Sequence, residues 1–413
     1  MAQGQGRLDP YIRALRVLWD RFLWTRHQPT VTAPHVRDRV NTQRLLNNFV
    51  IASIPCALIG CWNLGDQIHV TLELLGRPTL EGWRAETMIA LGLGFEVGSE
   101  LAALIHGLLY FLPILLTAGL AGALCEVVFA VGRNKRVDEG LLSNAWLFSL
   151  ILPPSIPLTQ VALGMIFAMI VAKGIYGGTG RYLVSPPVLG LSFLTFSYSN
   201  VLFGADSWVP VPGYDDLTTI EIAVLEGGVR ALELVDYSWL QLFIGNQPGP
   251  IGVTSALACL LGAAWLIHSG SGSWRIMAGS AIGMVLSVSL LQAIGPGDDP
   301  MFDTPWYWHA VIGGWAFGTV FLATDPMAAA TTRVGRWVFG VMVGVLTIVV
   351  RLTNPAYFEG VVFAILLASI FAPLCDYFVV ERNIKRRQAR LASTEAVGDA
   401  EAAEAPGAEE ASA

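Results

Sequence analysis

Three acidic residues lie inside or at the ends of long apolar stretches, where a charged side chain is energetically unfavourable. Glu126 lies within AGALCEVVFAV, Asp325 within ATDPM and Asp376 within APLCDYF. Hydrocarbon does not solvate a carboxylate, so an ionisable group at membrane depth is a candidate functional group. The three acids are therefore candidate functional residues of a transporter-like protein. The alternative for each is a solvated acid at a helix end, and Asp325 before Pro326 also fits a turn.

A glycine-rich segment, residues 174–183 with the sequence GIYGGTGRYL, is a second candidate site. Glycine-rich turns let the backbone approach a phosphate or a flat ring closely. No strand pattern precedes the segment, so it is not the phosphate loop of a Walker or dinucleotide-binding fold. The pattern predicts either a turn that contacts a ligand or one of the glycine-rich loops common in membrane proteins.

The middle of the chain, residues 203–251, is a polar interruption between two apolar halves. It carries seven acidic residues against a single Arg230, together with the adjacent threonines Thr218 and Thr219, whose hydroxyls can form phosphoesters.

Elsewhere no Ser/His/Asp or Cys/His pattern occurs, and His106 and His309 lack partner ligands at metal spacing. The pattern therefore predicts neither a catalytic residue nor a metal centre.

The composition predicts an all-α polytopic membrane protein. Hydrophobic residues make up 54% of the 413 residues and charged residues 14%, against roughly 25% charged residues in soluble domains. Several apolar runs reach the ~20 residues that a helix needs to cross a bilayer. Five cysteines lie in apolar stretches without CxxC spacing, so no disulfide scaffold is expected. No signal peptide and no nucleic-acid partner are expected, while contact with membrane lipid is.

We expect about ten transmembrane helices with both termini in the cytoplasm. If the N-terminus is cytoplasmic, 21 of the 25 Lys and Arg residues fall on the cytoplasmic side and four on the other side, as the positive-inside rule requires. The central polar segment then lies outside, in the periplasm. The expected spans are 47–66, 100–132, 140–153, 157–173, 186–202, 252–268, 276–295, 308–323, 337–352 and 361–380.

Five spans on either side of the central segment start from opposite sides of the membrane, which predicts two inverted five-helix repeats. Residues 8–24 have the spacing of an amphipathic helix. The predicted regions are a cytoplasmic N-terminal region with this helix (1–46), a first membrane half (47–202), a periplasmic segment (203–251), a second membrane half (252–380), and a cytoplasmic basic end with an acidic tail, disordered from residue 391 (381–413).

Several sequence blocks in one order resemble a known family. They include HVRDRVNTQRLL, YGGTGR, FIGNQPGPIG, GGWAFGTVFLATDP, RLTNPAYFEG and FAPLCDYFVVERNIKRR. From about residue 35 to residue 390 the chain resembles the B subunit of the bacterial sodium-translocating NADH:quinone oxidoreductase. The related D subunit of Rnf complexes shares the fold. The resemblance implies a membrane component of a six-subunit complex in the bacterial inner membrane, which passes electrons from NADH to ubiquinone and exports Na⁺.

The resemblance also implies the cofactors and the site residues. It implies riboflavin and an FMN joined to a threonine by a phosphoester. The residues that match cofactor-binding positions are Thr218 for covalent FMN, Gly213, Tyr214, Gly178, Gly180, Arg181 and Ser185. The residues that match quinone and ion positions are Gly122 and Ala123 for quinone and Glu126, Asp325 and Asp376 for the cation.

The chain departs from the family pattern around two of these motifs. An Asp-Asp-Leu sequence (215–217) precedes the threonine where the family carries Ser-Gly-Ala, and its carboxylates would repel an incoming phosphate. In the glycine-rich motif Tyr182, Ser185 and Pro187 stand where Asn, Asn and Ala are usual, and Val253 stands in place of a Glu. Two functions therefore stay open: a subunit of a redox-driven sodium pump, or a flavin-depleted paralogue that conducts ions or anchors partners.

Overall fold

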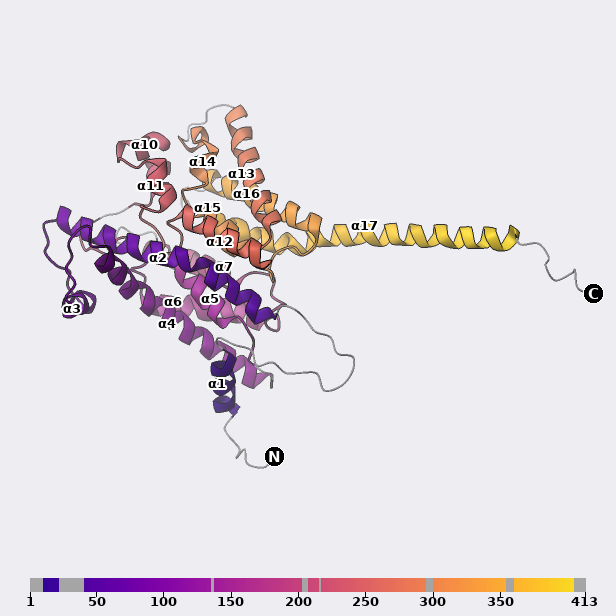
Figure 1. The fold of residues 1–413 in the computed structure, drawn as a ribbon, viewed down its shortest axis with the longest axis horizontal. Coiled ribbons are helices and arrows are strands. Elements are labelled where there is room, and N and C mark those ends of the chain that lie inside the picture. The colour runs from indigo at the N-terminus through magenta and orange to yellow at the C-terminus, as the bar shows by residue number, and fades with distance from the viewer. Residues whose placement is uncertain are drawn as a thin grey trace, which may run out of the picture.

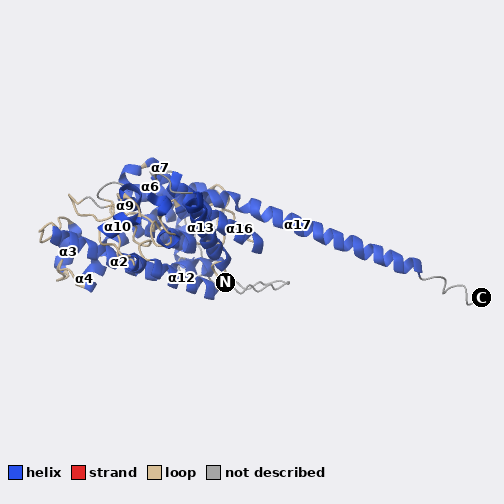
Figure 2. Ribbon diagram, turned by 90° about the horizontal axis from the view of Figure 1, so that it is seen from above, coloured by secondary structure: helices blue, strands red, loops and turns tan. Residues whose placement is uncertain are grey.

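The computed structural model describes residues 10–21, 41–134, 137–202, 207–214, 217–294, 300–353 and 360–404. Within these ranges the regular structure is helical throughout (Figures 1 and 2). The predicted amphipathic segment forms α1 (Pro10–Arg21), which packs on α4. Five helices are long and apolar enough to cross a membrane, and four shorter apolar helices accompany them. This confirms a polytopic helical membrane protein, while the number of ten spans stays a prediction.

The first half is built on two long helices packed through glycines. Its elements are α2 (Thr42–Leu74), α3 (Trp83–Ala90), α4 (Glu100–Gly132), α5 (Leu141–Leu150), α6 (Leu158–Ala168), the π-helix η1 (Met169–Gly174), α7 (Pro186–Ser197) and α8 (Ser199–Leu202). A Cβ atom on Gly65 or Gly107 would collide with the facing backbone at Ala103 and Cys61. Such small residues let two membrane helices approach closely where there is no hydrophobic driving force between them.

The second half also contains two long helices that pack through glycines. Its elements are α12 (Ala256–Ser269), α13 (Trp274–Ile294), η2 (Pro300–Asp303), α14 (Trp306–His309), α15 (Trp315–Phe317), the π-helix η3 (Gly318–Leu322), α16 (Arg333–Thr353) and α17 (Val361–Glu404). Gly283 and Gly344 bring α13 against α16. The span expected at 308–323 is broken, because Gly313 and Gly314 adopt positive φ angles of 64° and 67° between α14 and α15.

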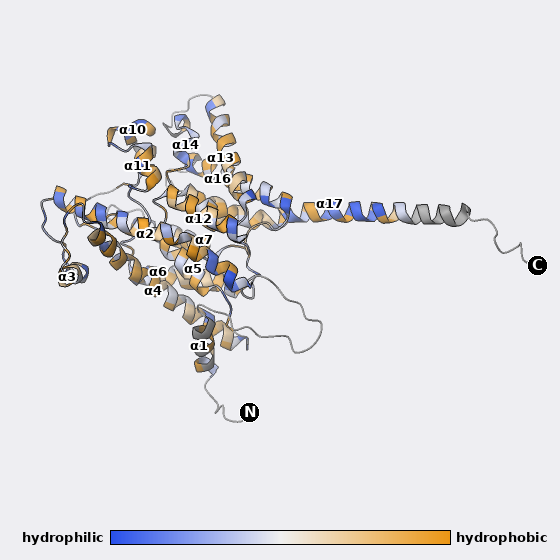
Figure 3. Cartoon of the chain, in the orientation of Figure 1, coloured by the Kyte–Doolittle hydropathy of each residue, from blue (hydrophilic) through white to orange (hydrophobic). Residues whose placement is uncertain are grey.

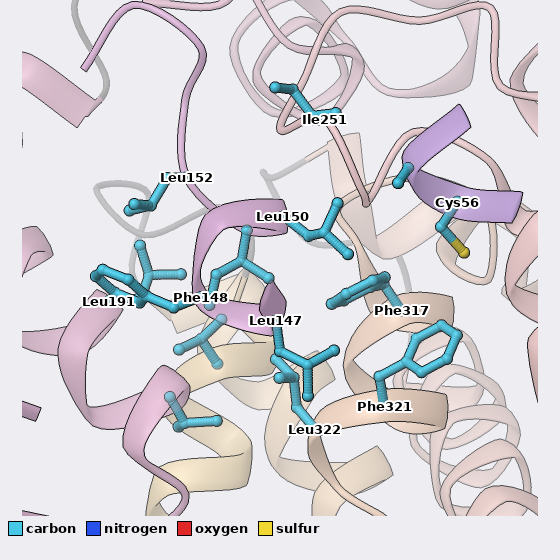
Figure 4. Close-up of a cluster of buried hydrophobic side chains, with 14 of the residues drawn as sticks. Cys56, Leu147, Phe148, Leu150, Leu152, Leu191, Ile251, Phe317, Phe321 and Leu322 are labelled. Atoms are coloured by element: carbon cyan, nitrogen blue, oxygen red, sulfur yellow. The ribbon is translucent and has the colours of Figure 1, made fainter. Parts of the chain in front are cut away.

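The two halves share one hydrophobic core (Figure 4). Leu147 and Leu150 of α5 lie beside Phe317 of α15 and Phe321 of η3. Cys56 of α2 approaches Cys259 of α12, with their Sγ atoms 3.8 Å apart. The halves are therefore packed into one unit, and neither is a separate globule.

The central segment, expected as a polar interruption, contains three short helices. They are α9 (Thr219–Glu226), α10 (Val229–Leu234) and α11 (Trp239–Ile244). Ile220, Leu232 and Leu242 are buried in a small core of their own that extends to Trp308 and Ile312 of the second half. This second core fixes the segment, and with it the two threonines, on the body of the protein.

Helix α17 begins in the body and continues far beyond it (Figures 1 and 2). Beyond the body, and up to its grey end, the helix is coloured mainly as hydrophilic with some hydrophobic residues between (Figure 3). The tail predicted to be disordered from residue 391 instead continues this helix through Glu404, because Ala and Glu are good helix formers that extend an existing helix at little cost. Residues 405–413 lie outside the described residues.

The predicted topology can be tested with two exposed positions on opposite sides. Leu234 in α10 is 85% exposed, and Ser393 lies on the exposed distal part of α17. We expect Leu234→Cys to react with a membrane-impermeant maleimide in intact spheroplasts and Ser393→Cys to react only after lysis. The unsubstituted chain is the control for its native cysteines. The reverse labelling pattern would overturn the orientation.

Candidate functional site

Glu126 forms a buried ion pair with Lys173. Glu126 lies in the last two turns of α4, and Lys173 lies near the end of the π-helix η1. Lys173 Nζ donates to Glu126 Oε1 at 2.5 Å, and the two side chains are 3% and 4% exposed. The same ammonium donates to the carbonyl of Glu139 at 2.9 Å. Turns of π-helix are rare in proteins, and those that occur are often found at functional sites. This local geometry therefore singles out the position of the lysine.

Gly122 and Ala123 lie one turn before Glu126, as the sequence predicts for a helix. A Cβ atom on Gly122 would come within 2.7 Å of Leu141 Cδ1 and 2.8 Å of Met165 Cε. Gly122 is therefore the point where α5 and α6 close on α4. Ala123 is partly buried against the same core. Packing alone accounts for the glycine, and quinone binding stays a prediction.

The glycine-rich segment folds around an acid, Asp138. Gly177, Gly178 and Gly180 have φ angles of 103°, 113° and 88°, a region that side chains other than glycine rarely adopt. A Cβ atom on Gly178 would collide with the carboxylate of Asp138, and the backbone N–H of Thr179 donates to that carboxylate at 3.3 Å. This contact brings the segment beside Glu126.

A pocket follows from this arrangement between α4, η1 and the glycine-rich turn. Its empty space, including the open mouth, is about 430 Å³. Its lining combines apolar and charged groups and comprises Cys125, Glu126, Phe129, Ala130, Arg133, Asp138, Met169, Lys173, Gly174, Gly177 and Gly178. Arg181 lies at the turn itself, with its Cδ atom 3.6 Å from the position of a Cβ on Gly177. Gly178 and Arg181 therefore lie near a pocket. The group that Gly178 faces, however, is the carboxylate of Asp138.

Asp325 is buried and held by neutral donors. The Tyr182 hydroxyl donates to its two oxygens at 3.3 and 3.4 Å, and the backbone N–H of Met327 donates at 3.0 Å. Ser185 also donates a side-chain hydrogen bond. Burial raises the pKa of Asp325, and these donors oppose the increase. Tyr182, at a position where the family resemblance expects Asn, therefore satisfies an acid of the other half.

Asp376 anchors the chain just before α16. Its carboxylate accepts four hydrogen bonds, from the backbone N–H of Thr331 at 2.7 Å and of Thr332 at 3.0 Å and from their hydroxyls at 2.8 and 2.6 Å. A carboxylate offers about four acceptor positions, so all of them are used here. The geometry supports a structural anchor, and a cation ligand at this position stays a prediction.

Thr218 is the N-cap of α9. Its backbone N–H and its hydroxyl both donate to Glu221 Oε2, at 2.7 and 2.8 Å, and the Glu221 N–H donates back to the hydroxyl at 3.3 Å. This reciprocal capping box satisfies donors at the helix start. Burial raises the pKa of Glu221, and the hydrogen bonds from Thr218 lower it. Thr219 has another partner: its hydroxyl donates to Gln247 Oε1 at 2.7 Å.

A small pocket lies beside both threonines, between the central segment and the second half. It is lined by Thr218, Thr219, Ile220, Gln247, Pro248, Gly249, Pro250, Val253, Thr254, Gly313 and Gly314. The preceding turn is fixed by Arg77, which donates to the Pro212 carbonyl at 2.8 Å. In that turn Gly213 has a φ angle of 82°, and Tyr214 packs partly buried against the main core. Residues 215 and 216 lie outside the described residues.

The structure joins some predicted site residues and separates others. Glu126 and Gly178 share one pocket, whereas Asp376 lies against the segment before α16 and Thr218 lies in the central segment. The glycine-rich segment lies between two acids. Gly178 faces Asp138, and Gly180 faces Met327, whose N–H donates to Asp325. Sequence reasoning missed Lys173 as a partner. The signal available was a lone lysine closing a long apolar run.

The two singled-out histidines have polar neighbours in the fold. His106 Nδ1 is 3.2 Å from Nε2 of His69, and His309 Nδ1 is 3.4 Å from a guanidinium nitrogen of Arg351. In the described ranges no three His, Cys, Asp or Glu side chains come together as a metal site would require.

Comparison with known proteins places this scaffold among quinone reductase subunits. The family model described as NQR2, RnfD, RnfE matches residues 30–385. The B subunit of the Na(+)-translocating NADH-quinone reductase of Azotobacter vinelandii is 42% identical over 389 residues, which cover 93% of this chain and 95% of the relative. The proteins of the same name from Pseudomonas paraeruginosa and Chromohalobacter salexigens are each 41% identical, over 90% and 91% of this chain and 92% and 90% of theirs.

The anchoring role of Asp376 predicts a stability effect. Asp376→Ala leaves the N–H groups of Thr331 and Thr332 without their acceptor, which should lower the free energy of unfolding by about 1–3 kcal/mol. The melting temperature of the purified protein reports this loss of stability. The matched control is Glu381→Ala, which removes an acid from the same helix whose partner is the exposed Lys385. Equal melting temperatures for the two variants would contradict the anchor.

Proposed function

The chain belongs to the NQR2, RnfD, RnfE family, and from this membership we propose that it is the membrane-embedded B subunit of a Na⁺-translocating NADH–quinone reductase. The observation that carries the proposal is identity of 42% with such a protein over 93% of this chain and 95% of the relative, so the similarity covers the whole membrane scaffold. The subunit works within a complex and is not catalytic alone. Its proposed place is the bacterial inner membrane, with both termini cytoplasmic.

In this proposal Glu126 is a sodium ligand. A carboxylate that is buried in a membrane helix and already paired with an ammonium can exchange one cation for another. Asp325 is proposed as a second acid on the ion path, reached through the glycine-rich segment. Asp376 is proposed as a third, although its four hydrogen bonds would have to break before it could hold an ion.

The second part of the proposal is that Thr218 carries FMN by a phosphoester, with riboflavin as a further cofactor. The adjoining pocket, lined by Gly249, Gly313 and Gly314, supports the position, because glycines allow a ring or a phosphate close to the backbone. Glu221 opposes a phosphate when it is charged. Because burial raises its pKa, a proton on this carboxyl would remove the repulsion and leave a donor for a phosphate oxygen. The flavin would supply electron transfer toward ubiquinone.

The proposed attachment can be tested by exchanging one hydroxyl at a time. We expect Thr218→Val to abolish covalent flavin and Thr219→Val to retain it, since only Thr218 matches the acceptor position. The readouts are flavin fluorescence of the denatured band and the intact mass of the polypeptide. Flavin lost from Thr219→Val and kept in Thr218→Val would move the acceptor by one residue. A bare polypeptide from cells with an active flavin transferase would favour the flavin-depleted alternative.

The proposed ion ligand can be tested in the assembled complex. Glu126→Gln should lower sodium-stimulated turnover about tenfold, because it removes the charge that holds the cation but keeps an acceptor for Lys173. Assembly is followed by co-purification of the other subunits. Glu100→Gln, at the exposed start of the same helix, is the control. Unchanged sodium dependence in Glu126→Gln would reduce Glu126 to a structural acid.

A further inference from the structure

The ammonium of Lys173 is held by two oxygen atoms. It lies 2.5 Å from Glu126 Oε1 and 2.9 Å from the Glu139 carbonyl, and the Thr179 hydroxyl donates to that same carbonyl at 2.6 Å. Carboxylate and carbonyl oxygens are ligands that hard metal cations prefer. The lysine therefore fills a place whose chemistry suits a small inorganic cation.

Only one of the two carboxylate oxygens of Glu126 has a hydrogen-bond partner among the described residues. Glu126 Oε2 is buried and has no hydrogen-bond partner among the described residues. A buried ion pair that serves packing alone is stable when all of its oxygens are satisfied, since each unsatisfied buried polar atom is destabilising. The second oxygen is thus free to accept a cation or its hydration water.

Two pockets meet at this carboxylate. The first is the 430 Å³ space at the glycine-rich turn, and the second lies among α1, α2 and the start of α5. Both are lined by Glu126 and Asp138, and the second also by the polar side chains of Gln43 and Asn47. An ion on its way to Glu126 therefore meets polar and charged groups among apolar ones, and Asp138 lines both pockets.

The backbone that follows Lys173 is rich in glycine. The lysine lies in a π-helical turn and is followed by Gly174, Gly177 and Gly178, the last two with positive φ angles. A lysine has a flexible four-carbon stem that ends in a point charge, unlike the planar fork of an arginine. It can leave one acceptor for another without rearranging a helix.

We propose that Lys173 is a tethered counter-ion, which neutralises Glu126 when the site holds no sodium and is displaced when Na⁺ binds. This inference rests on the proposed sodium role of Glu126 and adds the residue that sets the affinity. A buried carboxylate needs a cation or hydrogen-bond donors, and among the described residues the one donor to Glu126 is Lys173, so one of the two cations occupies the site. Because the tethered ammonium competes with Na⁺, it lowers the apparent sodium affinity in proportion to the time it occupies the site.

The test removes the tethered charge while keeping its length. In the complete complex, Lys173→Met should decrease the half-saturating sodium concentration for turnover about tenfold or more, given the coupling measured for close charge pairs. Equilibrium binding of radioactive sodium to the purified complex without NADH should tighten by the same factor. Lys173→Gln is a second neutral variant with the same expectation. In the Glu126→Gln background, Lys173→Met should have no further effect.

The control is another Lys–Glu pair of the same chain. Lys385 pairs with Glu381 on the exposed part of α17 at 2.8 Å, so Lys385→Met removes an ion pair of the same kind far from the pockets and should leave the sodium response unchanged. An equal shift in Lys385→Met would overturn the proposal, since the effect would then be one of overall charge. Failure of both neutral variants to assemble, while Lys173→Arg assembles, would also overturn it by making the pair a structural one.

The outcomes separate this inference from the proposed function. If Glu126→Gln keeps the normal sodium dependence, the sodium role of Glu126 itself is wrong. If Glu126→Gln loses that dependence while both neutral Lys173 variants bind sodium with unchanged affinity, the sodium role stands and only the tethered counter-ion is wrong.

Discussion

A carboxylate that is withdrawn from water into a membrane protein must be compensated by a cation or by hydrogen-bond donors, and the region around the end of α4 is arranged around that requirement at Glu126. The π-helical turn after α6 brings Lys173 to the carboxylate, and the glycine-rich turn that follows folds back on Asp138. Gly122, one turn earlier on α4, lets α5 and α6 close around the pair. Packing and charge compensation therefore depend on each other here.

The acids that the sequence groups together are compensated in different ways. Glu126 has an ammonium, Asp325 has the neutral donors Tyr182 and Ser185, and Asp376 has two threonines. The type of partner decides what each can do. An ammonium can be exchanged for another cation without leaving a buried charge, whereas the Asp376 contacts would have to be broken first. Of the three, Glu126 is the acid whose partner is itself a cation.

The central segment shows how an apparently polar insertion is fixed in place. Its short helices bury a small core of their own against α14, and Gln247 connects it to the membrane helices, because the Gln247 carbonyl accepts from Asn63 of α2 at 2.8 Å. Gly252 adds a backbone hydrogen bond to Leu150 at the end of α5. These contacts hold Thr218 and its pocket at the junction of the two halves, so a group attached there would be positioned by both.

The sequence by itself determined the class of the protein, the order of most apolar helices and the family, because hydropathy and local motifs are properties of contiguous residues. It also singled out Glu126 and Thr218. Only the tertiary structure decided the distant partners, Lys173 for Glu126 and Tyr182 for Asp325. These two pairs are separated by 47 and 143 residues in the chain, and no periodic pattern encodes such contacts. The break at Gly313 and Gly314 was also missed, since an apolar run has the same hydropathy whether its helix is continuous or interrupted.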